Sequence, residues 1–320
     1  MNFIAILAAL GLEQWRTLPW RAGIERAFVS YARMLESRLN GGTVGQGMVA
    51  TLLAILPPVL VAAVLGWLCA RASPFLALVF NVFVLYLLMG FRRFSHAVSA
   101  IVLALKTGDV TAARRALAQW RGGSTSELSS QDVAKCTIES GLVDAYRQVF
   151  AVLFWFTVLP GPAGAVLYRA AALLAQQWRG DLRGEEDTPI LRSLTRFGRP
   201  AQRLLWVLDF VPVRLTALSF AVVGDFEDAV YCWRTQSRAW PAELGGVTAG
   251  ILLASGGGAL GMQLGGELPT LAGEPDVRPG MGIGETVEPD MMPSAVGLVW
   301  RALVLWLLLI LLLTLANLAP

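Results

Sequence analysis

Two ionisable residues of opposite sign, Asp209 and Arg214, lie inside the apolar segment 204–223. The segment is long enough to cross a bilayer, which takes about 20 apolar residues. A charged side chain at that depth costs about 3 kcal/mol even on the lenient insertion scale, so such residues are rare and usually functional. Pro212 lies between them and would kink or break a helix. The pair is either a structural ion pair between helices or a polar site inside a helical membrane bundle, and we favour the site.

Two further clusters could bind phosphate or a metal, and each has a structural alternative. The glycines at 256–258 could bring backbone amides to an anion. Glycine in an apolar helix more often allows close packing, which we favour here. Asp225, Glu227 and Asp228 could hold Mg²⁺ or could cap a helix, and the sequence does not decide between the two.

Thr125 and Ser126 could bind phosphate, but we favour a role as caps of a helix that begins near Glu127. Other kinds of site lack their residues. His96 is the single histidine, and the three cysteines are widely separated. A multi-histidine metal site and a disulfide framework are therefore not expected.

The composition is that of an integral membrane protein. Of the 320 residues, 55% are hydrophobic and 15% are charged, whereas about a quarter of a soluble domain is charged. We expect one membrane domain. Residues 1–15 have neither a basic region nor a cleavage site, so we expect no signal peptide. Their apolar run is about half a bilayer long and should enter the membrane only partway or lie at its surface.

Apolar runs and arginine-rich flanks predict an all-α, polytopic helical bundle with broken or re-entrant helices and no strands. We expect spans near 47–69, 74–89, 204–223 and 298–318. Residues 92–148 should form a helical region outside the membrane. Because two spans separate this region from the arginines of 13–47, both should lie on the cytoplasmic side.

Two more apolar segments carry helix breakers. Segment 150–175 contains Pro160–Pro162, so each half should be too short to cross alone. The arginines of 176–203 would violate the positive-inside rule if the segment crossed once, so we predict a broken hairpin. Residues 244–266 should be a glycine-rich segment within the membrane, followed by a loop at 267–293.

Several different short motifs follow one another along the chain in a recognisable order. They are Gly108-Asp109, Thr125-Ser126, Ile138–Ser140, Leu153–Trp155, Gly161–Arg169, Pro212–Leu218 and Gly258–Gly266. This order, which covers about residues 95 to 266, resembles the CobD/CbiB family of cobalamin biosynthesis and its relative AmpE. The resemblance implies a bacterial inner-membrane enzyme with several spans and mainly cytoplasmic polar loops.

The family's synthase joins adenosylcobyric acid to aminopropanol or its phosphate through an amide bond, using Mg-ATP. The resemblance therefore implies a corrinoid substrate, or another anionic small molecule, beside the bilayer and no nucleic-acid partner. It leaves the oligomeric state open. It implies catalytic roles for the carboxylates Glu139, Asp144 and Asp209, with Glu139 and one of the two aspartates near Mg²⁺. It implies substrate or phosphate binding by Thr125, Arg169, Arg203 and Arg214.

The chain also departs from the synthase pattern. Acidic or amide positions of that pattern are replaced by Val143, Arg147, Ala172, Ala175, Leu205 and Trp206. Arginine cannot serve as a Mg²⁺ ligand, so we assign no metal ligand firmly. The segment around Pro212 is closer to the AmpE branch, which is associated with β-lactamase induction. The alternative is thus an AmpE-like sensor or scaffold that binds without converting a ligand. A transporter ranks last because no inverted repeat is visible.

Overall fold

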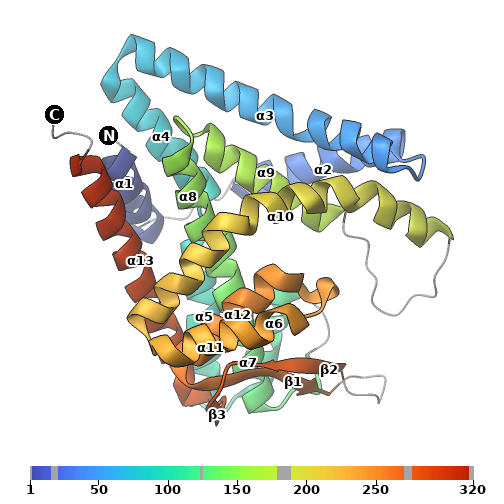
Figure 1. Cartoon of the computed structure of the whole chain (residues 1–320), viewed down its shortest axis with the longest axis vertical. Coiled ribbons are helices and arrows are strands. Elements are labelled where there is room, and N and C mark those ends of the chain that lie inside the picture. Colours follow the sequence, from blue (N-terminus) through green and yellow to red (C-terminus); the bar gives the residue numbers. More distant parts are fainter. Residues whose placement is uncertain (1, 16–20, 123–124, 179–188, 270–275, 317–320) are drawn as a thin grey trace. The chain divides into compact units, whose positions relative to one another are not determined.

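The computed structural model describes residues 2–15, 21–122, 125–178, 189–269 and 276–316. The described chain is mostly helical, as predicted (Figure 1). It divides into two compact units. The first unit comprises 1–89, 147–210 and 313–320, and the second comprises 90–146 and 211–312.

The first unit holds α1 (Asn2–Trp15), α2 (Arg21–Leu39), α3 (Val44–Ala72), α4 (Pro74–Leu88), α8 (Ala151–Val158) and α9 (Ala163–Gln177). The second holds α5 (Phe91–Lys106), α6 (Val110–Arg121), α7 (Ser130–Ala145), α11 (Phe226–Gln236), α12 (Gly246–Leu260), β1 (Met262–Leu268), β2 (Asp276–Met281) and β3 (Glu285–Thr286). Two further helices, α10 (Pro189–Val223) and α13 (Met292–Ala316), contribute residues to both units.

Four stretches of the described chain are long and apolar enough to cross a membrane. They are Val44–Ala72, Ser130–Val158, Arg196–Val223 and Pro289–Ala316. The predicted spans at 47–69 and 204–223 fall within α3 and α10, the part of 298–318 that the structure describes falls within α13, and 74–89 falls on the shorter α4. The chain is thus a polytopic helical membrane protein by length and composition of its helices.

Glycine contacts fix the packing of three helices in the first unit. A Cβ at Gly47 of α3 would collide with the carbonyl of Phe197 in α10. Gly66, near the other end of α3, contacts Pro162 at the start of α9. A Cβ at Gly198 would collide with the carbonyl of Trp178 at the end of α9. Helix α9 therefore runs antiparallel to α3 and α10, and the last two run parallel to each other (Figure 1).

Prolines do not break the long helices, and of the two outcomes expected at Pro212, a kink or a break, the break is absent. Helix α10 continues through Pro212 to Val223. A proline leaves the carbonyl four residues earlier without its usual N–H donor. The Trp155 indole donates to that carbonyl, on Leu208, at 3.1 Å. A tertiary donor thus replaces the missing backbone donor.

Helix α3 uses the same device at another proline. Pro57 lies inside α3 and leaves the Leu53 carbonyl without an N–H donor from the next turn. The Tyr31 hydroxyl of α2 donates to this carbonyl at 2.9 Å. Pro57 and Pro212 are therefore each compatible with a continuous helix, because an aromatic side chain of a neighbouring helix supplies the missing donor.

The helix break predicted at Pro160–Pro162 is present. Helix α8 ends at Val158 and α9 begins at Ala163. Residues 150–158, the first half of the segment, do not form a separate short helix but continue the helix that precedes them. Helix α7 passes through a π-helical turn at Tyr146–Phe150 into α8, which gives a helical stretch of 29 residues.

The second unit contains a small sheet, which corrects the prediction of helices throughout. Strand β1 lies between β2, its antiparallel partner, and β3, its parallel partner. It occupies the end of the predicted glycine-rich segment, and β2 and β3 occupy the predicted loop at 267–293. Gly265 and Gly266 both have φ of +75° and lie at a bulge in β1, a conformation that glycine adopts without strain.

The packing role favoured for the glycines at 256–258 is confirmed. They lie in α12, which is almost entirely buried. A Cβ on Gly256 would press on Leu142, and one on Gly258 would press on the backbone of Asp228. Gly257 faces the backbone of Gly282. These glycines let α12 lie close to α7, α11 and the sheet.

Candidate functional site

The structure divides the predicted site residues between the two units. Asp209, Arg169 and Arg203 belong to the first unit, and Glu139, Asp144, Thr125 and Arg214 belong to the second. Each unit therefore presents its own polar cluster.

In the second unit, Glu139 is held by a buried ion pair. It lies on α7 with 5% of its surface exposed. Its Oε2 accepts from Nη1 of Arg278 at 2.6 Å, and its Oε1 accepts from the Gly265 amide at 2.8 Å. The guanidinium of Arg278 also lies 5.6 Å from the ring centroid of Trp240. Both carboxylate oxygens of Glu139 are engaged, as in a structural ion pair.

Arg278 and Trp240 are site residues that the sequence reasoning missed. Arg278 is 3% exposed and lies on β2, in a stretch predicted to be a loop. Position 265, whose amide donates to Glu139, accepts only glycine. A Cβ at this position would collide with the carbonyl of Pro279. A lone arginine among prolines and glycines carries no local signal of burial, so only the fold identifies it.

Asp144 and Thr125 occupy the same unit with partners of their own. The Trp120 indole donates to Oδ2 of Asp144 at 3.0 Å. The Thr125 hydroxyl donates to the Arg114 carbonyl at 2.9 Å. Helix α7 begins at Ser130, and its cap is Ser129 in a reciprocal capping box. The prediction that Thr125 and Ser126 cap this helix is therefore wrong.

The acidic residues at 225–228 act at a helix start. The Asp225 side chain accepts from the Asp228 amide at 3.0 Å and caps α11. Glu227 and Asp228 lie in the first turn, where negative charge favours the helix dipole. Of the two roles left open by the sequence, capping is the one that this geometry displays.

In the first unit, Asp209 is a buried carboxylate paired with a phenol. It lies on α10 with 2% of its surface exposed, and its Oδ1 accepts from the Tyr168 hydroxyl at 2.9 Å. Tyr168 is itself fully buried on α9. Arg214, five residues along α10, is half-buried and belongs to the second unit.

Arg169, next to Tyr168, joins a charged network. Its Nη2 lies 2.7 Å from Oε1 of Glu25, and its Nε is buried without a hydrogen-bond partner. Arg21 lies 3.8 Å from Glu25 and 3.5 Å from Glu13, and it donates to the Leu88 carbonyl at the end of α4. The network connects α1, α2, α4 and α9. Glu13, Arg21 and Glu25 were not singled out from the sequence.

The carboxylates do not gather into a metal site within the described residues. In that part of the chain, no group of three or more His, Cys, Asp or Glu side chains is placed to hold a metal ion. Glu139, Asp144 and Asp209 each have a protein donor. The described residues therefore form no metal cage of their own, which a Mg²⁺ ion held by one or two carboxylates and substrate phosphates does not need.

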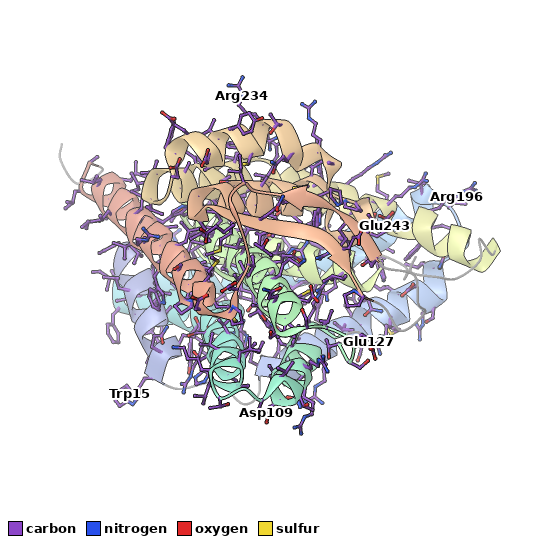
Figure 2. The ribbon with its side chains drawn as sticks, turned by 90° about the horizontal axis from the view of Figure 1, so that it is seen from below. Trp15, Asp109, Glu127, Arg196, Arg234 and Glu243 are labelled. Carbon is purple, nitrogen blue, oxygen red and sulfur yellow. The ribbon has the colours of Figure 1, made fainter. Side chains whose placement is uncertain are left out.

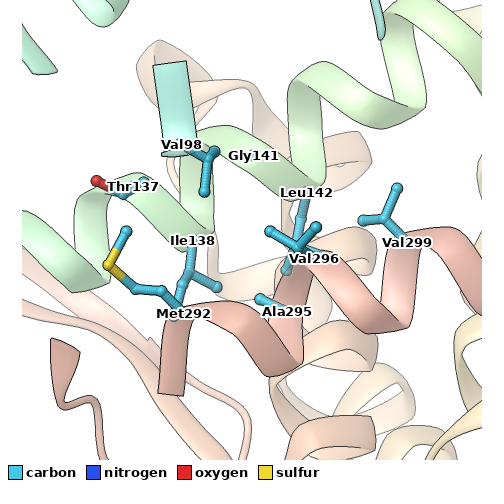
Figure 3. Close-up of a pocket in the computed structure, with 9 residues that line it drawn as sticks. All are labelled: Val98, Thr137, Ile138, Gly141, Leu142, Met292, Ala295, Val296 and Val299. Atoms are coloured by element: carbon cyan, nitrogen blue, oxygen red, sulfur yellow. The ribbon is translucent and has the colours of Figure 1, made fainter. Parts of the chain in front are cut away.

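An apolar crevice in the second unit lies between α5, α7 and α13 (Figure 3). Val98, Leu142 and Met292 line it. Thr137 is the lining residue with a side-chain hydroxyl, and it donates to the Val133 carbonyl of its own helix at 2.6 Å. The crevice offers packing surface rather than polar chemistry.

The long apolar helices with buried charges define a multi-pass helical membrane protein. The profile of the family described as CobD/Cbib protein matches residues 6–299. A cobalamin biosynthesis protein CobD of Stutzerimonas stutzeri (strain A1501) is 34% identical over 313 residues, which cover 97% of each chain. Another of Chromobacterium violaceum is 37% identical over 257 residues, covering 80% of this chain and 76% of the relative.

The chain therefore belongs to the CobD/CbiB family of cobalamin biosynthesis. A more distant relative, the cobalamin biosynthesis protein CobD of a Synechocystis species, is 27% identical over 255 residues, or 76% of this chain and 69% of the relative. No solved structure gives a significant match.

Proposed function

We propose that this protein forms the amide bond between adenosylcobyric acid and aminopropanol or its phosphate, at the cytoplasmic face of a bacterial inner membrane. The observation that supports this proposal is the near full-length relationship to a protein named for cobalamin biosynthesis, with 97% of each chain covered. Relatives of this kind share a fold from end to end, so a substrate in the same pathway is the simplest inference.

The first unit offers the better candidate contacts for an anionic substrate. Arg169 carries a buried Nε without a hydrogen-bond partner, and an arginine fork suits carboxylates and phosphates. Asp209 is buried and accepts a hydrogen bond from Tyr168, which precedes Arg169 in the chain. We propose Arg169 for substrate binding and Asp209 for proton handling. Since the described carboxylates form no cluster of three, we assign none of them individually to Mg²⁺.

An assay of the purified protein in detergent tests the proposal. It would receive adenosylcobyric acid, aminopropanol phosphate and Mg-ATP, and the corrin product would be followed by mass. We expect product from the wild type and a loss of at least 100-fold in Asp209→Asn, a typical effect of removing an acid–base group. No product from folded protein, with an active synthase assayed alongside, would contradict the proposal.

The second candidate is a non-catalytic, AmpE-like membrane sensor or scaffold. The engagement of both Glu139 oxygens by Arg278 and Gly265 favours it, because that carboxylate is not open to a metal or substrate. A folded protein that binds adenosylcobyric acid in equilibrium dialysis without converting it would support this function over the first.

A further inference from the structure

Three arginines form an exposed stripe on the first part of α10. Arg196, Arg199 and Arg203 are all exposed, and their spacing of three and four residues places them on one face of the helix. Figure 2 shows Arg196 pointing away from the ribbon. From Arg196 to Phe210 the acidic residue is Asp209, which is buried on another face.

The rotation of this helix is fixed by contacts on its opposite face. Phe197 and Ala201 are fully buried. The ring centroid of Phe197 lies 4.8 Å from that of Trp178, and Gly198 leaves no room for a Cβ against the Trp178 carbonyl. The helix cannot turn about its axis without breaking these contacts, so the arginines are held outward.

The same exposed face becomes apolar immediately after the arginines. Trp206, Val207 and Phe210 are 55%, 59% and 45% exposed. The rings of Trp206 and Phe210 meet edge to face with centroids 5.9 Å apart. Tryptophan is enriched where a membrane span meets its interface. The order along this face is therefore basic, then aromatic, then apolar.

Helix α3 independently gives the depth of the stripe. Its exposed apolar surface begins at Val44 and continues through Met48 and Leu52. Gly47 of α3 packs against Phe197, so the arginines lie level with the start of that apolar surface. From Arg203 to the end of α10 at Val223 the helix rises about 30 Å, the thickness of the hydrocarbon core. Both helices thus place the arginines at headgroup level.

We propose that Arg196, Arg199 and Arg203 form a binding surface for the phosphates of anionic phospholipids. Guanidinium groups hydrogen-bond phosphate in a bidentate manner, and basic residues beside a span attract anionic lipid. Arg196 and Arg199 have no role in the amide-forming activity proposed above, whereas Arg203 is also a candidate for substrate binding, so the test leaves Arg203 unchanged. The surface anchors α10, and with it the depth of Asp209, through the lipid that surrounds the protein.

A lipid titration followed by native mass spectrometry tests this surface. Detergent-purified wild-type protein should bind phosphatidylglycerol in preference to phosphatidylcholine. The variant Arg196→Gln/Arg199→Gln, which leaves Arg203 in place, should lose about 30-fold in apparent affinity for phosphatidylglycerol, given the usual contribution of each basic residue. High salt should weaken wild-type binding in the same direction.

Two controls keep the result interpretable. Arg196→Lys/Arg199→Lys retains the charge and should keep most of the preference, which separates lost binding from lost folding. Arg234→Gln/Arg238→Gln removes the same charge from exposed positions on and after α11 and should behave as the wild type (Figure 2 labels Arg234). Equal binding by the Gln variant, equal binding of both lipids, or displacement of the lipid by inorganic phosphate at the same concentration would overturn the proposal.

Discussion

Glu139 and Arg278 bind each other in the interior of the second unit, 139 positions apart in the chain. Removing one partner of a buried ion pair leaves the other charge without compensation and costs about 3 kcal/mol or more. We therefore expect Glu139→Gln to lower the stability of the protein by about that amount. Thermal unfolding in detergent would measure the loss.

A double substitution separates this structural role from a catalytic one. In Glu139→Leu/Arg278→Met both charges are absent, so most of the lost stability should return. If Glu139→Gln proved as stable as the wild type and lost activity alone, the ion pair would not be what holds β2 on α7, and a catalytic role would be favoured.

Glu36 of α2 gives a prediction about pH. Burial raises the pKa of this carboxyl above its ordinary value, and Arg33 opposes part of the rise. A raised carboxyl pKa stabilises the folded state below the ordinary pKa, and this contribution is lost as pH rises through the folded value. Glu36→Gln should therefore match the wild type in acid and become the more stable protein towards neutral pH.

The comparison requires melting temperatures of both proteins over a pH series. Glu127→Gln, a change at an exposed glutamate, is the matched control and should leave the difference from wild type unchanged across the series (Figure 2). If the melting temperature of the wild type instead rose relative to that of Glu36→Gln with increasing pH, the prediction would be contradicted.

At the scale of helices, the hydrogen bond from Trp155 to the carbonyl that Pro212 leaves without a backbone donor can be tested directly. Trp155→Phe removes the donor to Leu208 and leaves that carbonyl unsatisfied, which costs about 1–3 kcal/mol. Pro212→Ala would restore a backbone N–H that can bond Leu208 within the helix. The Trp155→Phe loss should therefore be much smaller in the Pro212→Ala background, as a double-mutant cycle of thermal stabilities would reveal.

Trp67→Phe is the control for the cost of losing an indole, because Trp67 is 58% exposed on α3. Its loss should be small. If Trp155→Phe costs the same in both backgrounds, the indole stabilises α10 by packing and not by satisfying the carbonyl that Pro212 frees.

This hydrogen bond also shows how far sequence reasoning reaches. The apolar runs at 47–69 and 298–318 and the break at Pro160–Pro162 followed from local pattern, because length and proline act within one segment. The continuity of α10 did not, since it depends on Trp155, which lies 53 positions from Leu208. The pairing of β1 with β2 could not be predicted for the same reason, because the buried Arg278 of β2 is stabilised by Glu139, which lies on a helix distant in the sequence.

Among the site residues, the pattern of the family selected Glu139 and Asp209, and both are buried. It could not supply their partners. Tyr168 was part of the quoted motif but was not assigned a role, and Arg278 lay outside every motif. The partner of a buried side chain depends on which helices pack together. That packing is a property of the whole fold and cannot be read from one segment of the sequence.

At the scale of the whole chain, the parallel packing of α3 and α10 predicts a membrane topology for the first unit. Gly47 and Phe197 lie side by side at one position along the axis of α3, and Gly66 and Pro162 lie side by side at another. The two positions are 19 residues apart on α3, or about 28 Å, which is close to the thickness of the hydrocarbon core. The turn at Pro160–Pro162 should therefore reach the opposite membrane surface.

Single cysteines would test this topology in a background that lacks Cys69, Cys136 and Cys232. We expect Ser37→Cys and Arg196→Cys to react with an impermeant maleimide from the same side, the cytoplasmic one, because arginines concentrate before α3 and before the apolar part of α10. Pro160→Cys should react only from the other side. All three residues are exposed in the folded protein. Labelling of Pro160→Cys from the cytoplasmic side would instead mean that the α8–α9 hairpin turns back inside the membrane, and opposite sides for Ser37→Cys and Arg196→Cys would contradict the parallel packing of α3 and α10.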